Sequence, residues 1–133
     1  MKIIADTNVL VRAVVRDDVK QARAASKILK EAELIAVTLP CLCELVWVLQ
    51  RVYDFGRQEI GAALEALVDA GNVVLNRPAV EAGLEVFHAG GDFADGLIAY
   101  EGSWLGGETF VSFDKKAVSL LAKRGQDSKL LVS

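Results

Sequence analysis

Four acidic residues are far apart along this 133-residue chain, and each lies beside or inside an apolar run: Asp6, Glu44, Asp95 and Asp114. A carboxylate taken out of water without a partner costs free energy, so an acid next to hydrophobic residues is expected to have a hydrogen-bond donor, a helix terminus or a cation as its partner. Because the four acids share this setting, we predict that they converge on one acidic pocket.

Repulsion would decide the chemistry of such a pocket. Two unit charges about 4 Å apart repel each other by about 4 kcal/mol at an effective dielectric constant near 20. Either some of the acids are protonated at neutral pH or the pocket holds a cation, and we favour the cation. Donors that are all oxygen, without His or Cys, indicate one or two Mg²⁺ or Mn²⁺ ions. Ions of this kind activate water for the hydrolysis of phosphodiesters.

Each acid also has a simpler explanation when it is taken alone. Asp6 and Asp114 follow apolar strands and precede helices, where an Asp side chain serves as an N-cap. The carboxyl ends of strands are also where open α/β sheets bind ligands. Asp92 and Asp95 are three residues apart at a helix start, which suits an N-cap followed by an acid in the first turn.

Glu44 is harder to explain structurally because no other charge lies between residues 41 and 49. Residues 42, 45, 46 and 49 have the spacing of a core-facing helix stripe, which places Glu44 on a different, partly apolar face with Trp47 and Arg51. The alternatives are a salt bridge to Arg51 or pairing of Glu44 with the dipole of the helix's first turn.

Hydrophobic periodicity predicts alternating strands and helices. Strands are expected at residues 2–5, 34–37, 73–75 and 109–112, with a further edge strand at 129–132; residues 2–5 should form a buried strand. Helices are expected after Asp6 and at residues 18–32, 42–52, 57–70 (closed by Gly71 as C-cap), 78–87, from 92 to about 102, and 114–122. This alternation predicts one α/β domain over residues 1–133, with a parallel-rich central sheet of four or five short strands flanked by helices.

Composition sets further limits. The net charge of −3, from 15 basic and 18 acidic residues, argues mildly against a nucleic-acid ligand. If the four acids and Asp92 are set aside, however, 13 acidic and 15 basic residues remain. Cations bound to the five acids would remove this argument against a nucleic-acid ligand. No membrane span or secretory segment is apparent, which predicts a cytoplasmic protein. The spacing of Cys41 and Cys43 suits buried thiols rather than a redox or zinc pair, and His88 is expected on a helix surface.

A basic stripe runs along the helix expected at residues 18–32. Its members recur at helical spacing and comprise Arg16, Lys20, Arg23, Lys27 and Lys30. The stripe is either a solvated face or a contact for RNA phosphates.

The segments IIADTNVL, DFADGLIA and TFVSFD, together with Glu44 in the third helix, resemble the PIN-domain ribonucleases, and most of all their VapC-type toxins. The resemblance covers nearly the whole chain. It implies that Asp6, Glu44, Asp95 and Asp114 bind Mg²⁺ or Mn²⁺ for RNA cleavage, with Asp92 as an auxiliary candidate. Thr7, Asn8 and Ser112 match polar residues that orient the ligands through hydrogen bonds.

The resemblance also implies partners. Family members of this type usually form homodimers, cleave RNA such as tRNA or rRNA, and are inhibited by a small VapB-like antitoxin that lies along a hydrophobic groove. A surplus of apolar residues agrees with a protein partner, and Trp47 is either part of such an interface or part of the core.

We therefore predict a metal-dependent endoribonuclease, the toxin of a type II toxin–antitoxin module. One alternative is a PIN nuclease of RNA maturation or decay, or a structure-specific DNA nuclease, with the same acids. A more remote alternative is a non-catalytic, magnesium-binding signalling domain. Asp6 stands alone after its strand, whereas phospho-acceptor receivers usually place two acids there, which disfavours that last class.

Overall fold

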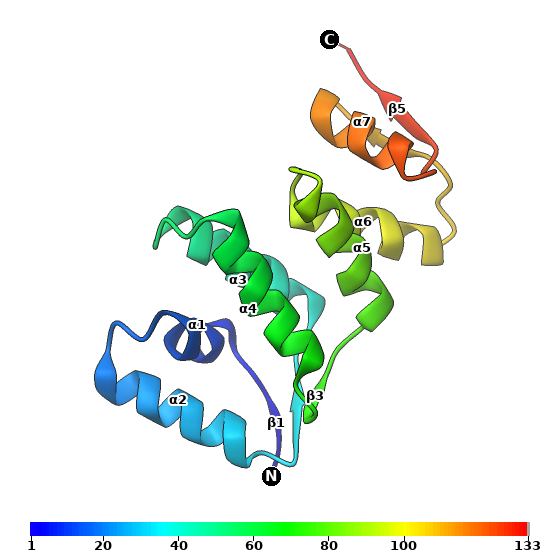
Figure 1. Cartoon of the computed structure of the whole chain (residues 1–133). Helices are drawn as coiled ribbons and strands as arrows, with labels where there is room; N and C mark the ends of the chain where they lie inside the picture. The colour runs from blue at the N-terminus through cyan, green and yellow to red at the C-terminus, as the bar shows by residue number, and fades with distance from the viewer. Residues whose placement is uncertain (133) are drawn as a thin grey trace. The chain divides into compact units, whose positions relative to one another are not determined.

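The computed structural model describes residues 1–132. The chain divides into two compact units, Met1–Asn76 and Arg77–Ser133, and each is described by itself. Helices and strands alternate in both (Figure 1). The α/β class is confirmed, whereas a single domain over residues 1–133 stays a prediction.

The first unit contains a three-stranded parallel sheet and four helices. Its elements in chain order are β1 (Lys2–Ile4), α1 (Thr7–Val15), α2 (Val19–Glu31), β2 (Leu34–Ala36), α3 (Leu39–Arg51), α4 (Arg57–Asp69) and β3 (Val73–Val74). The strand order is β1-β2-β3, with Ile3 opposite Ile35 and Ile35 opposite Val73. Parallel neighbours need crossover connections, and the helices supply them.

The core of the first unit lies where α1 packs on α2 and α3. The stripe expected on α3 is buried as predicted, with Leu42, Leu45, Val46 and Leu49 each at most 5% exposed. Ile60 and Leu64 of α4 are also buried. Burial of such side chains contributes about 1.5–3 kcal/mol each, so this core holds the helices that carry the first two acids.

Three expectations for the first unit are wrong in detail. The strand at residues 2–5 is not buried throughout, since Ile4 is 81% exposed; alternate residues of a strand face opposite sides, and only the side with Ile3 and Ala5 is covered within this unit. Helix α3 begins at Leu39 rather than Leu42, with Thr38 as N-cap. Helix α4 ends at an extended Ala70, so Gly71 is not its cap.

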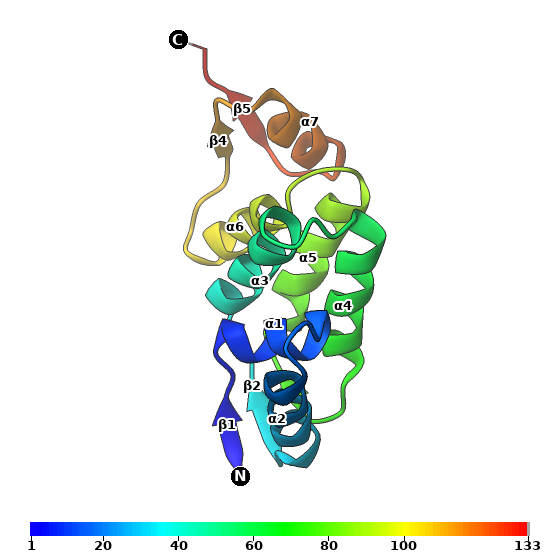
Figure 2. The same cartoon turned by 90° about the vertical axis from the view of Figure 1, so that its left-hand side faces the viewer.

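The second unit contains three helices and a parallel pair of strands. Its elements are α5 (Arg77–His88), α6 (Phe93–Trp104), β4 (Phe110–Ser112), α7 (Lys115–Lys123) and β5 (Ser128–Leu130). Strands β4 and β5 pair with Phe110 opposite Ser128, and α7 packs against both (Figure 2). Within residues 1–132, five strands thus pair in two parallel sheets, one in each unit.

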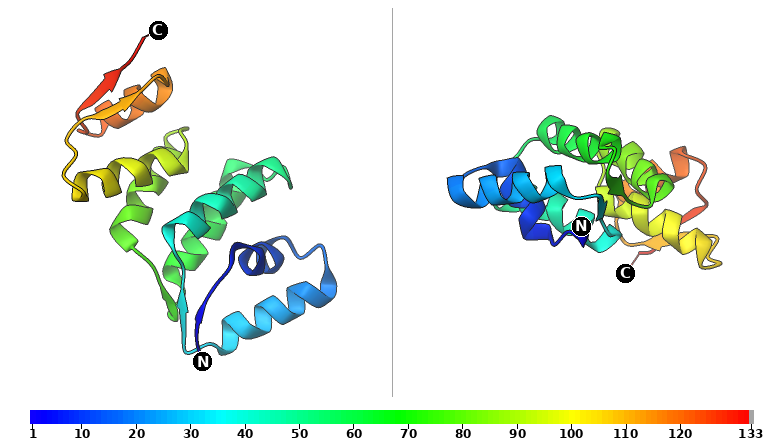
Figure 3. Two further views of the ribbon diagram at one scale, coloured as in Figure 1. Left: turned by 180° about the vertical axis from the view of Figure 1, so that it is seen from behind. Right: turned by 90° about the horizontal axis from the view of Figure 1, so that it is seen from below.

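Helices α5 and α6 form the closest helix pair of the second unit (Figure 3, left). A Cβ added at Gly96 would clash with the carbonyl oxygen of Ala82 and would lie 2.7 Å from the Cα of Gly83. Only a residue without a side chain fits there, because backbone meets backbone. The glycines thus bring α6, which carries Asp95 next to Gly96, directly onto α5.

Within residues 1–132, every helix is too short or too polar to cross a membrane.

Candidate active site

Asp6 and Glu44, predicted as site residues, line the same cavity in the first unit. This cavity has a volume of about 410 Å³ and lies between the end of β1 and the start of α3. Asp6 is the N-cap of α1 and accepts a 2.8 Å hydrogen bond from the backbone N–H of Thr7. Its expected capping role is therefore present.

The structural alternatives for Glu44 are wrong. Because α3 begins at Leu39, Glu44 lies beyond the first turn, which contains no acid. Within residues 1–132, Glu44 forms no salt bridge with Arg51, and its side chain is exposed. An exposed carboxylate beside a second carboxylate, without a cationic partner in its own unit, is a suitable ligand for a cation.

Cys41 belongs to this cavity, although the sequence suggested only a buried thiol. It is 8% exposed, and its Sγ donates to the carbonyl oxygen of Ala5 at 3.6 Å. Burial raises the pKa of the Cys41 thiol, and the charges of Asp6 and Glu44 raise it further against a lowering hydrogen bond with Thr7. The signal in the sequence was the three-residue spacing of Cys41 and Glu44, which places both on adjoining parts of one helix face.

The second unit holds the remaining acids. Asp92 is the N-cap of α6 and accepts from Ala94 N at 3.1 Å, and Asp114 is the N-cap of α7 and accepts from Ala117 N at 3.1 Å. Asp95 lies in the first turn of α6, as expected. Capping alone therefore explains Asp92 and Asp114, and Asp95 is the acid whose setting is unusual.

Asp95 is half-buried and surrounded by negative charge. Burial, the largest cause, together with the charges of Asp92 and then Asp114, raises the pKa of its carboxyl group from 3.8 to about 6. An acid whose ionised form is disfavoured in this way gains most from a bound cation. Asp92 and Asp114 are therefore close enough to Asp95 for their charges to act on it.

The residues predicted to orient the ligands have different surroundings. Thr7 is 6% exposed and lies in the cavity of Asp6 and Glu44. Ser112 Oγ accepts a 2.9 Å hydrogen bond from the backbone N–H of Asp114 and so fixes the turn that presents this acid. Asn8 lines a different cavity, between α1 and α2.

The acids thus form two groups, one in each unit. Neither unit by itself, within the described residues 1–132, brings three acidic, histidine or cysteine side chains into the arrangement of a metal centre. The donor chemistry nevertheless fits a hard cation, because every predicted ligand is a carboxylate. Convergence of the two groups stays a prediction.

Two other predicted features have clear outcomes. His88 is exposed at the end of α5, as expected. Trp47 is 57% exposed, so its place in the core of its own unit is excluded, whereas its use in an interface stays a prediction.

A comparison with protein-family models matches residues 3–120 to the PIN domain. This match includes all the predicted site residues and extends over both units. No match was found among curated proteins or among solved structures.

Proposed function

Since the chain belongs to the PIN domain family, whose members are generally metal-dependent nucleases, we propose that it is an endoribonuclease that hydrolyses RNA phosphodiester bonds. The observation that carries the proposal is the family match across residues 3–120, because Asp6, Glu44, Asp95 and Asp114 all lie within it. Bound Mg²⁺ or Mn²⁺, as one or two ions, supplies an activated water and neutralises charge that develops on the phosphate.

The chain's own residues have distinct parts in this proposal. Asp6 and Glu44 offer carboxylate oxygens from one cavity, and Asp95 and Asp114 offer them from the second unit. Thr7 and Ser112 hold neighbouring groups in place, Ser112 through the backbone N–H of Asp114. Asp92 caps α6 and adds negative charge beside Asp95, so we assign it an auxiliary role.

The same proposal includes the biological setting, the toxin of a toxin–antitoxin module that forms a homodimer and is inhibited by a small antitoxin. Exposed apolar side chains support a protein partner, Trp47 and Val52 in the first unit and Trp104 and Leu105 in the second, each at least 57% exposed. Large apolar side chains left in water are typical of interaction surfaces.

The test is cleavage of a labelled single-stranded RNA by purified protein with Mg²⁺ or Mn²⁺. Asp6→Asn should lower the rate by more than about 100-fold, since even the partners of metal ligands contribute about 10- to 100-fold. Asp18→Asn is the matched control, because Asp18 is an equivalent N-cap on α2 that accepts from Gln21 N at 3.0 Å, and Asn caps as well as Asp. Cleavage by Asp6→Asn at the parental rate would exclude this site.

A further inference from the structure

Helix α2 carries a charge opposite to that of the rest of the chain. Between Val19 and Glu31 there are four basic residues and one acid, Glu31 itself, which leaves 11 basic and 17 acidic residues elsewhere, a net charge of −6. The four define the basic face of α2 and comprise Lys20, Arg23, Lys27 and Lys30, all exposed. From Lys20 to Lys30 the face extends about 15 Å along the helix.

One acid lies on the same helix, Glu31, four residues after Lys27. None of the four side chains of the basic face forms a salt bridge in residues 1–132. The nearby acids before the helix are already engaged, Asp17 with Arg12 at 3.0 Å and Asp18 with the N-terminus of α2. An isolated row of like charges on one helix is unfavourable by itself, so a polyanionic partner would relieve it.

Arg16 extends the basic face at a cost in backbone strain. It is the C-cap of α1 with φ 60° and ψ 29°, a left-handed conformation that glycine adopts without penalty. Its Nη1 donates to Ser26 Oγ on α2 at 2.9 Å, which holds the guanidinium beside that helix. An arginine in a position suited to glycine is consistent with a role for its side chain.

A cavity lies between α1 and α2, and two of the α2 residues that line it, Gln21 and Ala24, adjoin Lys20 and Arg23 in sequence. It has a volume of about 540 Å³, within the range of about 300–1,000 Å³ typical of ligand pockets. Val9, Ala25 and Ile28 form its apolar part, and its polar groups are the amides of Asn8 and Gln21 and the guanidinium of Arg12. Amides offer both hydrogen-bond donors and acceptors, as the edge of a nucleobase requires.

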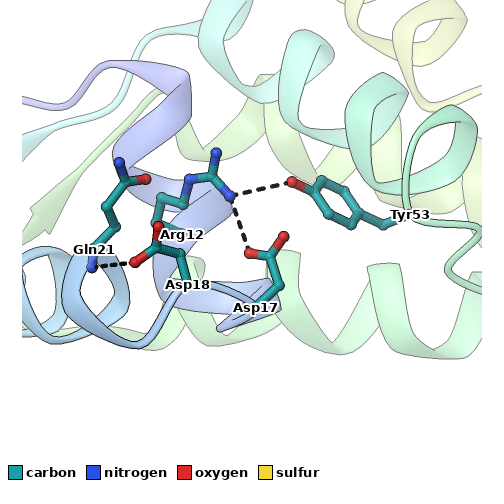
Figure 4. A network of polar contacts seen from close by, with 5 residues as sticks. All are labelled: Arg12, Asp17, Asp18, Gln21 and Tyr53. Atoms are coloured by element: carbon teal, nitrogen blue, oxygen red, sulfur yellow. Dashed lines mark hydrogen bonds and ion pairs between the residues drawn. The ribbon is translucent and has the colours of Figure 1, made fainter.

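Arg12 is held in position at the cavity. Its Nη1 donates to Asp17 Oδ1 at 3.0 Å and to Tyr53 Oη at 3.4 Å (Figure 4). Both bonds use Nη1, so Nη2 and Nε remain for a ligand within the described part of the chain. A guanidinium fixed in this way loses little entropy when it stacks on or hydrogen-bonds to a base.

We propose that the cavity between α1 and α2, together with the basic face of α2, binds single-stranded RNA, the cavity receiving one unstacked base and the basic face the phosphates beside it. This inference rests on the proposed function, since it assigns substrate recognition to the same unit that carries Asp6 and Glu44. Asp6 caps α1, and Asn8 and Arg12 follow on that helix at about 3 and 9 Å along its axis. Bases bind side chains in this way only when they are unpaired, which excludes duplex RNA.

The basic face is tested by RNA binding without cleavage. Fluorescence anisotropy with a labelled 12-nucleotide single-stranded RNA, in EDTA, compares the parent with Lys20→Glu/Lys27→Glu. Each lost phosphate contact lowers the salt slope by about 0.7 and the affinity about 5-fold at 0.1 M salt, so the pair should weaken binding about 25-fold. The matched control is Lys2→Glu/Lys129→Glu, which makes the same charge change at exposed residues of β1 and β5. Equal losses in both double variants would overturn the assignment.

The cavity is tested by filling it. Ala24 is an exposed residue of α2 that also lines the cavity, and Ala24→Leu adds volume in a residue that favours helix. We expect about tenfold weaker binding of single-stranded RNA, within the range of one lost base contact, and an unchanged salt slope. Parental affinity in Ala24→Leu would exclude the base from the cavity. Circular dichroism verifies the fold of each variant.

Failure of this inference is distinct from failure of the proposed function. Loss of cleavage in Asp6→Asn with parental RNA binding in Lys20→Glu/Lys27→Glu overturns only the binding surface. RNA binding as expected, with equal cleavage by parent and Asp6→Asn, overturns only the site. If the parent fails to bind the RNA in EDTA but binds a polyglutamate peptide through Lys20 and Lys27, the surface serves a protein partner and the RNA assignment is wrong.

Discussion

The half-buried carboxyl group of Asp95 predicts that this acid destabilises the metal-free protein at neutral pH. Its pKa is about 6 in the folded chain against 3.8 for an unperturbed group, raised by burial and by Asp92 and Asp114. The folded state therefore prefers the protonated form. Below pH 3.8 Asp95 is protonated in both the folded and the unfolded state, and its full contribution to the free energy of unfolding is present. This contribution is lost as the pH rises through about 6, because the folded state must then hold an ionised carboxylate.

The magnitude follows from the same shift. Two pKa units correspond to about 3 kcal/mol, which we halve to about 1.5 kcal/mol because the carboxylate keeps contact with solvent, where charge interactions are screened. An acid in the first turn also gains about 0.5 kcal/mol from the helix dipole, which an amide loses. Asp95→Asn should therefore raise the free energy of unfolding by about 1 kcal/mol at pH 7.5.

The assay is urea unfolding in EDTA at pH 4, 6 and 7.5, followed by circular dichroism. The gain in the free energy of unfolding of Asp95→Asn over the parent should be absent at pH 4 and should grow toward pH 7.5. The control is Glu101→Gln, which changes an exposed acid on the same helix and should show a smaller pH-dependent change. An advantage that is equal at all three pH values, or an Asn variant less stable than the parent at pH 7.5, would refute the electrostatic reasoning.

Four further outcomes are expected. Mg²⁺ at about 100 times its dissociation constant should stabilise the parent by about 2.7 kcal/mol in urea unfolding and Asp95→Asn much less; equal gains would remove Asp95 from the ligands. Glu44→Gln should lose RNA cleavage as fully as Asp6→Asn while its melting temperature is retained, because Glu44 is exposed and without an ion pair in residues 1–132. Gly96→Ala should lower the free energy of unfolding by about 1–3 kcal/mol, since its Cβ meets the carbonyl oxygen of Ala82; unchanged urea midpoints would contradict this packing. Trp47→Asp should shift the protein toward monomer in light scattering, and an unchanged mass would exclude Trp47 from a self-interface.

Local features of the site were predictable because local rules determine them. Asp6, Asp92 and Asp114 cap helices, as their places before apolar periodic segments indicated. The position of Glu44 outside the buried stripe of α3 followed from the 3.6-residue period that buries Leu45 and Leu49. The start of α3 was placed three residues late, at Leu42, although Thr38 and Pro40 both indicate a helix that begins at Leu39.

Features made by distant segments were not predictable. The cavity of Asp6 and Glu44 depends on how β1 meets α3, and the bond from Cys41 to Ala5 joins residues 36 apart. The contact of Arg12 with Tyr53 spans 41 residues. The close packing of α6 on α5 also joins separate segments, and the single glycine at position 96 did not reveal it by itself.

The glycine contact between α5 and α6 has a mechanical consequence for Asp95. Helix α6 touches the backbone of α5 through Gly96, and it therefore has no softer side chain there that could yield. The backbone of α6 next to Asp95 is therefore held against α5 and cannot shift to carry Asp95 toward water. The electrostatic cost of the ionised Asp95 carboxylate is lowered by a proton or by a bound cation. The close backbone contact at Gly96 thus holds the helix segment that presents Asp95 to a cation.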